Sequence, residues 1–470
     1  MSQILPKDNS ETALCLSALN KLEPRSRDII SKIHRHVQLR NAGGADARWI
    51  IIDTDAGLCK MADYDDPLAL VLISALHRLG YVKLKGVNVT GMKRSTNISF
   101  VKNLLASIGL GDVHVVAGEE EYDSEDWDAE RLKRTKKRRD TMLCEDERSR
   151  WQREHQSSTE LDTATSLQVQ GYAGDHRKLS SEIYLEASKL GKKVSRVIMT
   201  GLQTLDTFLQ DPNMEKLFRE NTDTIYLQGG MQFEEGRLIP DENARNMYYH
   251  IHSSANVLSY AQRHGIPIRC WTKNAAVACA KDGKWLKELS ELPHAGMQQK
   301  DELRTSVDAH QFWDTLNPER RFRKNVLTPE SFLQFKTTIP SEKIAPTAAY
   351  FEHKYGQMPN DQVFQEEYSQ YLAEFRETLS DKTKLILYDD LPILDLMEEE
   401  LKDELGLSMP YKMDQDEELE RTFKVFGKSV EDPGLNVENI QETIIALTKY
   451  AILSSLEDRG AYLNACGKKK

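Results

Sequence analysis

Short apolar runs alternate with amphipathic stretches along most of this chain, and this alternation limits its fold more than any other feature. WIIID at 49–53 is almost wholly apolar, and DDPLALVLISALHRLG at 65–80 has the length and apolar content of a helix. VKLKGVNVTG at 82–91 follows as a second apolar run, and the same order recurs as far as IPIRCWT at 266–272. Strands buried on both faces and separated by helices are typical of parallel sheets. The pattern predicts an α/β fold with a Rossmann-like, mostly parallel sheet flanked by helices, which binds ligands at the carboxyl ends of its strands.

Stretches that lack this alternation mark the boundaries of the expected regions of the chain. We expect an N-terminal helical extension at 1–47 and an α/β core at 48–281, interrupted at about 119–170 by a charged insertion. In that insertion an acidic block runs into a basic one, which favours a solvated segment over a docking loop. Residues 282–380 are charged and helical and are interpreted as a helical insertion. The remaining parts are a last core strand and helix at 381–407 and a helical C-terminal tail at 408–470.

Composition excludes several classes of function. The 63 basic and 74 acidic residues leave a net charge of −11, which argues against nucleic acid or an anionic membrane as a partner. The 6 cysteines contain no CxxC pair, so reduced thiols are a simpler interpretation than disulfides or a zinc site. No secretory signal and no membrane-spanning apolar run is recognisable. We therefore expect a soluble, cytoplasmic protein with a small-molecule ligand, and a homo-oligomer is left open.

Aspartates are concentrated directly behind the first apolar run. They are Asp53, Asp55, Asp63, Asp65 and Asp66, and four of them fall where the first strand ends and the next helix begins. Carboxylates this close raise one another's pKa. A positively charged or strongly hydrogen-bonding group is therefore expected among them.

Two further strand ends carry oxygen donors. TGLQT at 200–204 follows one predicted strand and YDD at 388–390 follows another, and the carboxyl ends of parallel strands meet at one edge of a sheet. Carboxylate and carbonyl oxygens are the ligands of Ca²⁺ or Mg²⁺, and no His/Cys set with zinc spacing competes. Taken separately, DTD at 53–55 and the pair Asp389–Asp390 are typical of helix caps. Together these segments predict a site for a hard cation.

Several stretches, in order, resemble the inosine–uridine-preferring nucleoside hydrolase family. Members begin with a strand, DTDPG, one residue and DDA-x-AL, whereas this chain has DTDAG, then LCKMADY, then DDPLAL. GVNVTG with Asn103, VIMTGLQTLDTFL, IYLQGGM with Asn246 downstream, and YDDLPILDLM resemble later motifs of the family. The similarity covers roughly residues 48–275 and 384–400.

The resemblance implies calcium-dependent hydrolysis of the N-glycosidic bond of a ribonucleoside or a related N-ribosyl compound, giving ribose and free base. It implies that Asp55 binds Ca²⁺ and acts as general base on a metal-held water. The other implied roles are a bidentate calcium ligand at Asp66, a ribose hydrogen bond at Asp65, a metal-binding backbone carbonyl at Thr204, a distal carboxylate ligand at Asp389, a ribose contact at Asn246, and ordering of the loop by Asp53. Carboxylates suit this reaction because its transition state resembles a ribosyl cation.

Three positions depart from the family pattern. Where the family has a ribose-contacting Asn after the second strand, this chain has Met92, or Lys93 if the alignment gap falls differently. Where the family has a Glu two residues before the ribose-binding Asn, this chain has Ala244. The His that often protonates the departing base is Tyr388, which can stack on a base. With an ordinary pKa of about 10, Tyr is a poorer acid near neutrality. His176 is the first histidine to test as a replacement acid.

Two alternatives to the hydrolase are open. A strand followed by DxD also begins the Mg²⁺-dependent, haloacid-dehalogenase-like phosphatases. Their pattern would make Asp53 the nucleophile, Asp55 the acid–base, Thr200 the second motif, and Asp389 and Asp390 the magnesium pair. DDPLAL so soon after DxD does not suit that family. A catalytically inactive metal-binding scaffold is the other alternative, and the departures at 92, 244 and 388 favour it.

Overall fold

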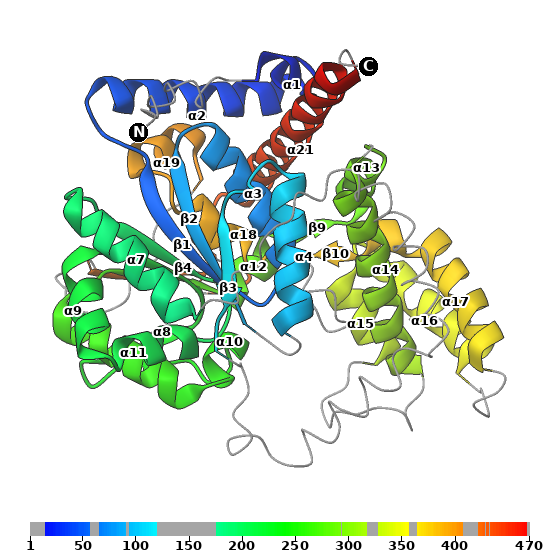
Figure 1. Cartoon of the computed structure of the whole chain (residues 1–470). Helices are drawn as coiled ribbons and strands as arrows, with labels where there is room; N and C mark the ends of the chain where they lie inside the picture. The colour runs from blue at the N-terminus through cyan, green and yellow to red at the C-terminus, as the bar shows by residue number, and fades with distance from the viewer. Residues whose placement is uncertain are drawn as a thin grey trace.

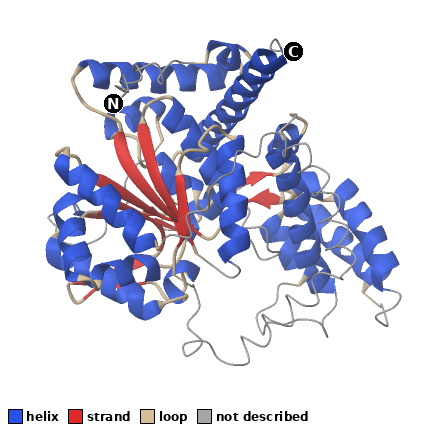
Figure 2. Cartoon of the chain, in the orientation of Figure 1, coloured by secondary structure: helices blue, strands red, loops and turns tan. Residues whose placement is uncertain are grey.

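A parallel β-sheet forms the centre of the computed structural model (Figures 1 and 2). The structure describes residues 15–56, 65–90, 94–119, 175–292, 294–316, 328–356, 364–407, 422–427, 429–431 and 433–467. Seven strands pair in the order β11-β8-β5-β4-β1-β2-β3, and every pairing is parallel. The predicted α/β, Rossmann-like sheet is confirmed. Its strands are β1 (Arg48–Thr54), β2 (Val82–Val89), β3 (His114–Ala117), β4 (Val194–Ile198), β5 (Thr222–Gly229), β8 (Ile268–Thr272) and β11 (Phe423–Phe426).

Helices cover both faces of this sheet because its strands bury both faces. Along β1, Ile50 and Ile52 pack into one apolar cluster, while Trp49 and Ile51 pack into the other. Such alternation follows from the two-residue period of a strand. The first cluster includes α3 (Asp66–Arg78), α4 (Arg94–Ser107), α18 (Asp390–Leu394), α19 (Glu399–Leu405) and α21 (Val437–Gly467). The second includes α7 (His176–Lys189), α8 (Gln203–Leu209), α9 (Pro212–Asn221) and α11 (Ile251–His264).

The two ends of the described chain pack together. The N-terminal helices α1 (Leu16–Asn20) and α2 (Pro24–Ala42) lie against the C-terminal helix α21, at the top of Figure 1. The hydroxyl of Tyr450 in α21 accepts the backbone N–H of Cys15 at 3.1 Å. A small hairpin follows β5, formed by β6 (Met231–Glu234) and β7 (Arg237–Pro240), and α10 (Arg245–Tyr248) comes next.

Residues 282–380 are mostly helical where the structure describes them. They carry an apolar cluster of their own around Phe312, Trp313 and Tyr371, to the right of the sheet in Figure 1. A short antiparallel pair joins the two ends of this region, β9 (Lys281–Asp282) to β10 (Lys384–Leu385). The elements between them are α13 (Lys284–Ser290), α14 (Ala295–Leu316), α15 (Pro329–Lys336), α16 (Ser341–Tyr355), α17 (Phe364–Thr378) and η3 (Ser380–Lys382), while α12 (Lys273–Ala278) precedes β9.

The structure differs from expectation at the last strand. Residues 381–407 do not add a strand to the central sheet, because β10 pairs only with β9. The edge strand beside β8 is β11, which lies in the region expected to be wholly helical. Ile386 and Leu387 are buried in the core without strand pairing. A short apolar run looks the same in sequence whether it pairs in a sheet or only packs.

Some expectations lie outside the described residues. They concern LCKMADY at 58–64, which includes Asp63, then Met92 and Lys93, and the charged insertion from residue 120 onward. None of the described helices is long and apolar enough to cross a membrane.

A buried ion-pair cluster joins β8, α18 and α19. Asp395 accepts hydrogen bonds from Arg269 Nη2 at 2.6 Å, Lys402 Nζ at 2.6 Å and Trp271 Nε1 at 3.0 Å. Burial alone would raise the pKa of Asp395, but the charges of Arg269 and Lys402 outweigh it and lower that pKa to about 2. The cluster fixes the C-terminal end of α18, whose first residues carry the predicted ligand segment.

Replacing Asp395 with Asn should remove an acid-sensitive part of the stability. Because the folded pKa lies below the ordinary value, the carboxylate stabilises the fold above about pH 4 and this contribution disappears as the pH falls toward 2. Urea unfolding should show that the pH-dependent difference between wild type and Asp395→Asn, about 2 kcal/mol, shrinks over that window. Asp381→Asn breaks an exposed pair with Lys287 and is the control, expected to cost less than about 1 kcal/mol. Parallel pH profiles for wild type and Asp395→Asn would contradict this assignment.

Candidate metal centre

Three carboxylates from two distant segments meet beyond the carboxyl end of β1. Asp65, Asp66 and Asp389 each offer one oxygen, and these oxygens lie within 4.8 Å of one another. The three residues are exposed by only 0%, 0% and 3%. Carboxylates this close and this buried repel one another unless a cation or a proton is shared among them. An all-oxygen donor set suits Ca²⁺ or Mg²⁺, and in the described part of the chain no other cluster of His, Cys, Asp and Glu has this spacing.

The start of α3 places Asp65 and Asp66. Asp65 is the N-cap residue and Asp66 the first helical residue, with Pro67 in the first turn, where its missing N–H costs nothing. The positive end of the helix dipole favours carboxylates at both positions. Thr54, the last residue of β1, donates its hydroxyl to Asp66 Oδ1. Strand end and helix start are thus joined directly, although the segment between them lies outside the described residues.

A backbone hydrogen bond brings the third carboxylate into place. The N–H of Tyr388 donates to Asp65 Oδ2 at 3.0 Å, across 323 positions of sequence. Asp389 follows as the N-cap residue of α18, and Asp390 begins that helix. From the sequence, YDD was expected at the end of a core strand. The structure instead brings it there on a buried segment that packs beside α3.

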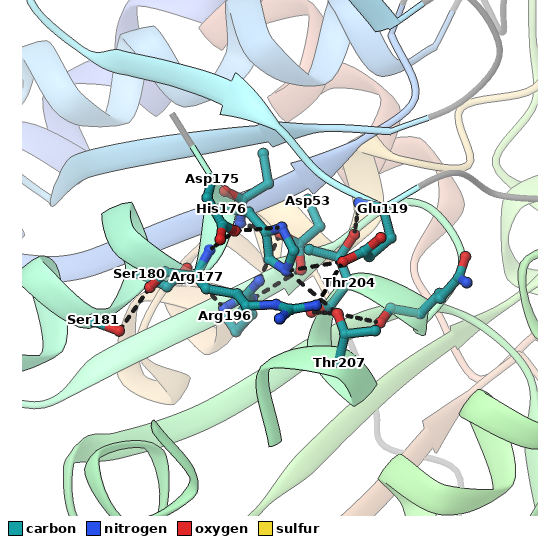
Figure 3. Close-up of polar contacts among 12 residues, drawn as sticks. Asp53, Glu119, Asp175, His176, Arg177, Ser180, Ser181, Arg196, Thr204 and Thr207 are labelled. Atoms are coloured by element: carbon teal, nitrogen blue, oxygen red, sulfur yellow. Dashed lines mark hydrogen bonds and ion pairs between the residues drawn. The ribbon is translucent and has the colours of Figure 1, made fainter. Parts of the chain in front are cut away.

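Asp53, the residue before Thr54 in β1, forms a fully buried ion pair with an arginine (Figure 3). Arg196 Nε and Nη2, from the neighbouring strand β4, donate to its two carboxylate oxygens at 2.8 and 2.9 Å. Asn88 Nδ2, from β2 on the other side, donates to Oδ1 at 2.6 Å. Asp53 and Arg196 are exposed by 1% and 0%. Arg196 is a positive group of the kind expected among the aspartates. The only hint of this pairing in the sequence was the presence of one arginine inside an apolar strand.

The other predicted site residues are placed as follows. Asp55 comes directly after β1, is partly exposed, and is not a member of the three-carboxylate cluster. Thr204 is the second residue of α8 and lies near Glu119. Its hydroxyl accepts the N–H of Glu119 at 3.0 Å, and its carbonyl accepts the hydroxyl of Thr207 at 3.2 Å. The Asn246 side-chain N–H₂ donates to the carbonyls of Met199 at 3.2 Å and Gln228 at 3.4 Å.

His176 is held between two carboxylates (Figure 3). Its Nδ1 lies 3.4 Å from Asp175 Oδ1, its Nε2 lies 3.7 Å from Glu119 Oε1, and Nε2 is 3.3 Å from the Thr207 hydroxyl. Burial lowers the pKa of His176 below 6.5, and the charge of Glu119 compensates only in part. The ring is therefore mainly neutral at pH 7, which makes His176 a poor proton donor there.

Small and hydroxyl-bearing residues pack this edge of the sheet closely. The hydroxyls of Thr90 and Thr200 are 2.9 Å apart, after β2 and β4. A Cβ at Gly118 would lie 2.7 Å from Thr90 Cγ2 and 2.8 Å from Thr204 Oγ1. Only glycine avoids this overlap, so the end of β3 can approach α8 as closely as it does.

Comparison with known proteins finds likeness in structure but not in sequence. No family profile and no curated protein matches the sequence. The chain is similar to the crystal structure of effector protein XOO4466, with 17% identity and a TM-score of 0.61 over 92% of this chain and 99% of that one. It is also similar to type III effector protein XopQ complexed with adenosine diphosphate ribose, with 16% identity and a TM-score of 0.59 over the same shares. A purine-preferring ribonucleoside hydrolase from Gardnerella vaginalis matches at 12% identity with a TM-score of 0.40, over 86% of this chain and 100% of that one. The two effector structures share the fold of this chain.

Replacing Arg196 with Met should destabilise the protein strongly. The change leaves the Asp53 carboxylate buried without its cation, and such losses cost about 3–5 kcal/mol. The double variant Asp53→Asn/Arg196→Met should recover part of this, which urea unfolding of both single variants and the double variant will measure. Arg219→Met, at an exposed pair with Glu215, is the matched control, expected to cost less than about 1 kcal/mol. Additive effects at Asp53 and Arg196 would contradict the buried pair.

Proposed function

We propose that this chain hydrolyses the N-glycosidic bond of a ribonucleoside or a related N-ribosyl compound, with the help of Ca²⁺. The observation that carries the proposal is the meeting of Asp65, Asp66 and Asp389 at the carboxyl end of a parallel sheet. Ligands of such folds bind at this edge. The complex of XopQ with adenosine diphosphate ribose, on the same fold, adds support for an N-ribosyl ligand.

The donor set fits a calcium ion. Asp66 and Asp389 are the proposed carboxylate ligands, and Asp55 and the Thr204 carbonyl complete the set. Asp65 lies in the same cluster, with one oxygen on the Tyr388 N–H. Its place allows it to contact the ion or a ribose hydroxyl beside it. Thr54 and Tyr388 hold two of these carboxylates by hydrogen bonds, and such supporting contacts orient ligands before the ion arrives.

Each of the proposed site residues has its own role in the hydrolysis. When bound, Ca²⁺ lowers the pKa of a water molecule and fixes the ribose diol. Asp55, at the partly exposed end of β1, accepts the proton of the attacking water. The buried carboxylates stabilise the positive charge that develops on the ribose as the bond to the base breaks. Asn246 and Tyr388 contact the ribose and the base.

Among the described residues considered for the site, we find no good proton donor for the departing base. His176 is mainly neutral at pH 7, and a tyrosine phenol, such as Tyr388 carries, is a weak acid near neutrality. A substrate whose base leaves as a neutral molecule without gaining a proton avoids this step. An N-ribosyl pyridinium compound is of this kind, so the substrate panel below includes one.

The phosphatase alternative requires a nucleophile that the geometry does not favour. Asp53 would have to attack phosphorus, yet both of its oxygens accept hydrogen bonds from Arg196 and Asn88 and it is 1% exposed. Charge-assisted hydrogen bonds of this kind lower nucleophilicity and hold the carboxylate in place. A catalytically inactive metal-binding scaffold is the second candidate, favoured by Ala244 and Tyr388.

Loss of either proposed ligand should abolish calcium-dependent stabilisation. For wild type, Ca²⁺ at about 100 times its Kd should add about 2.7 kcal/mol, measured as a rise in Tm by calorimetry. Asp66→Asn and Asp389→Asn should show no rise, because each removes a carboxylate from the cluster. Asp28→Asn, which breaks an exposed pair with Lys32 in α2, should respond as wild type does. Normal calcium responses in both ligand variants would refute the assignment.

A substrate panel separates the three candidate functions. Purified protein with Ca²⁺ should release reducing sugar from inosine, uridine or nicotinamide riboside, and the last is expected to react fastest. Asp55→Asn should lower kcat by about 10²–10⁴ if Asp55 is the general base. Phosphate released from p-nitrophenyl phosphate with Mg²⁺ would support the phosphatase instead. Calcium binding without either product would support the scaffold.

A further inference from the structure

A buried arginine of the helical region 282–380 reaches the segment that leads to Asp389. Arg304, in α14, is exposed by 1%. Its Nη1 donates to the Ser380 carbonyl at 3.1 Å and to the hydroxyl of Thr383. Two carboxylates of its own helix balance its charge, Asp301 at 2.9 Å and Asp308 at 3.4 Å. The contacts with Ser380 and Thr383 cross 76 and 79 positions of sequence, so they join α14 to the point where the chain returns to the core.

The return point itself is packed around the guanidinium. A Cβ at Gly283 would lie 2.6 Å from Arg304 Cζ, so glycine is required for this approach. The N–H of Gly283 donates to the Thr383 carbonyl at 2.8 Å, next to the β9–β10 pair. Arg304 therefore lies across the base of the helical region, where the chain leaves the core and where it re-enters.

Most of the short segment between this point and the candidate metal centre is buried. Thr383 is exposed by 0%, and the following residues Leu385, Ile386 and Leu387 are exposed by 0–1%. Tyr388 then donates its N–H to Asp65, and Asp389 follows. Beyond α18, Asp395 is held by Arg269 and Lys402. The segment carrying Asp389 is thus fixed near both ends by buried cations.

Stability alone is a weak explanation for Arg304. Burying an arginine is costly, and replacing a buried ion pair by apolar side chains is often neutral or stabilising. In the described part of the chain, Arg304 Nε and Asp308 Oδ1 are buried without a hydrogen-bond partner. The interactions that distinguish Arg304 are those with Ser380 and Thr383, which favours a role in placing that segment.

We propose that Arg304 is a positioning residue that holds Asp389 in the place required for metal binding, and that the helical region 282–380 is coupled to the metal centre through it. The inference rests on the metal site of the proposed function. It predicts that disturbing Arg304 weakens metal binding without any contact between Arg304 and the ion.

The test compares three variants of the full chain. Arg304→Met removes the guanidinium, and Thr383→Val removes only the hydroxyl it contacts. Tyr371→Phe is the matched control, because it removes a buried hydrogen bond to the Ala309 carbonyl (2.6 Å) within the same helical region. Calorimetric titration with Ca²⁺ should give a Kd raised about tenfold or more in the first two variants, the scale found for residues that support metal ligands, and an unchanged Kd in the control.

Hydrogen exchange without metal gives a second measurement. The Tyr388 amide, bonded to Asp65, should exchange about tenfold faster in Arg304→Met and Thr383→Val than in Tyr371→Phe. If Arg304→Met does not fold, Thr383→Val decides the question. A Kd within twofold of wild type in the folded variants, or an equal rise in Tyr371→Phe, overturns this inference and leaves the metal site standing. Failure of wild type to bind Ca²⁺ overturns the proposed function and this inference together.

Discussion

Negative charge gathered at the end of one buried strand is the constraint on which the rest of this structure depends. β1 ends in a segment that carries several aspartates into the sheet edge, where water is largely excluded. Three of the described aspartates each have a compensating partner. Asp53 has the guanidinium of Arg196, Asp66 has the hydroxyl of Thr54, and Asp65 has the N–H of Tyr388. Asp65, Asp66 and Asp389 lie close together, and their combined negative charge is the part that a cation would balance.

The elements around the sheet edge serve to hold that arrangement. β4 supplies Arg196, and α3 supplies a helix start that favours carboxylates. The segment from Thr383 to Asp395 crosses the edge and is anchored near both ends by buried cations. Its carboxylate therefore depends on parts of the chain far from it in sequence. This dependence gives the helical region 282–380 a physical connection to the candidate site.

Much of this was predictable because it rests on local patterns. Apolar runs at strand spacing with helices between them are typical of a parallel sheet, and the sheet is confirmed. The approach of YDD at 388–390 to Asp65 and Asp66 was also expected, but YDD reaches the sheet edge on a buried segment beside α3 and not at the end of a strand of the central sheet. The prediction of a central-sheet strand before YDD was wrong. An apolar run that pairs in a sheet and one that only packs in the core look alike in sequence. β11 was missed because FKVF is short and lies in a charged region that resembled a helix.

The sequence by itself determined the sheet, the faces of its helices and the concentration of oxygen donors at one edge, since these follow from periodicity and residue type. Only the tertiary structure decided which charges meet. Arg196 and Asp53 are 143 positions apart, and Arg304 and Thr383 are 79 apart. No local pattern encodes such pairs, because they depend on the order of strands in the sheet and on where the helical region rejoins the core. Tertiary structure also separated Asp53, fully engaged by its partners, from the aspartates of the candidate metal centre.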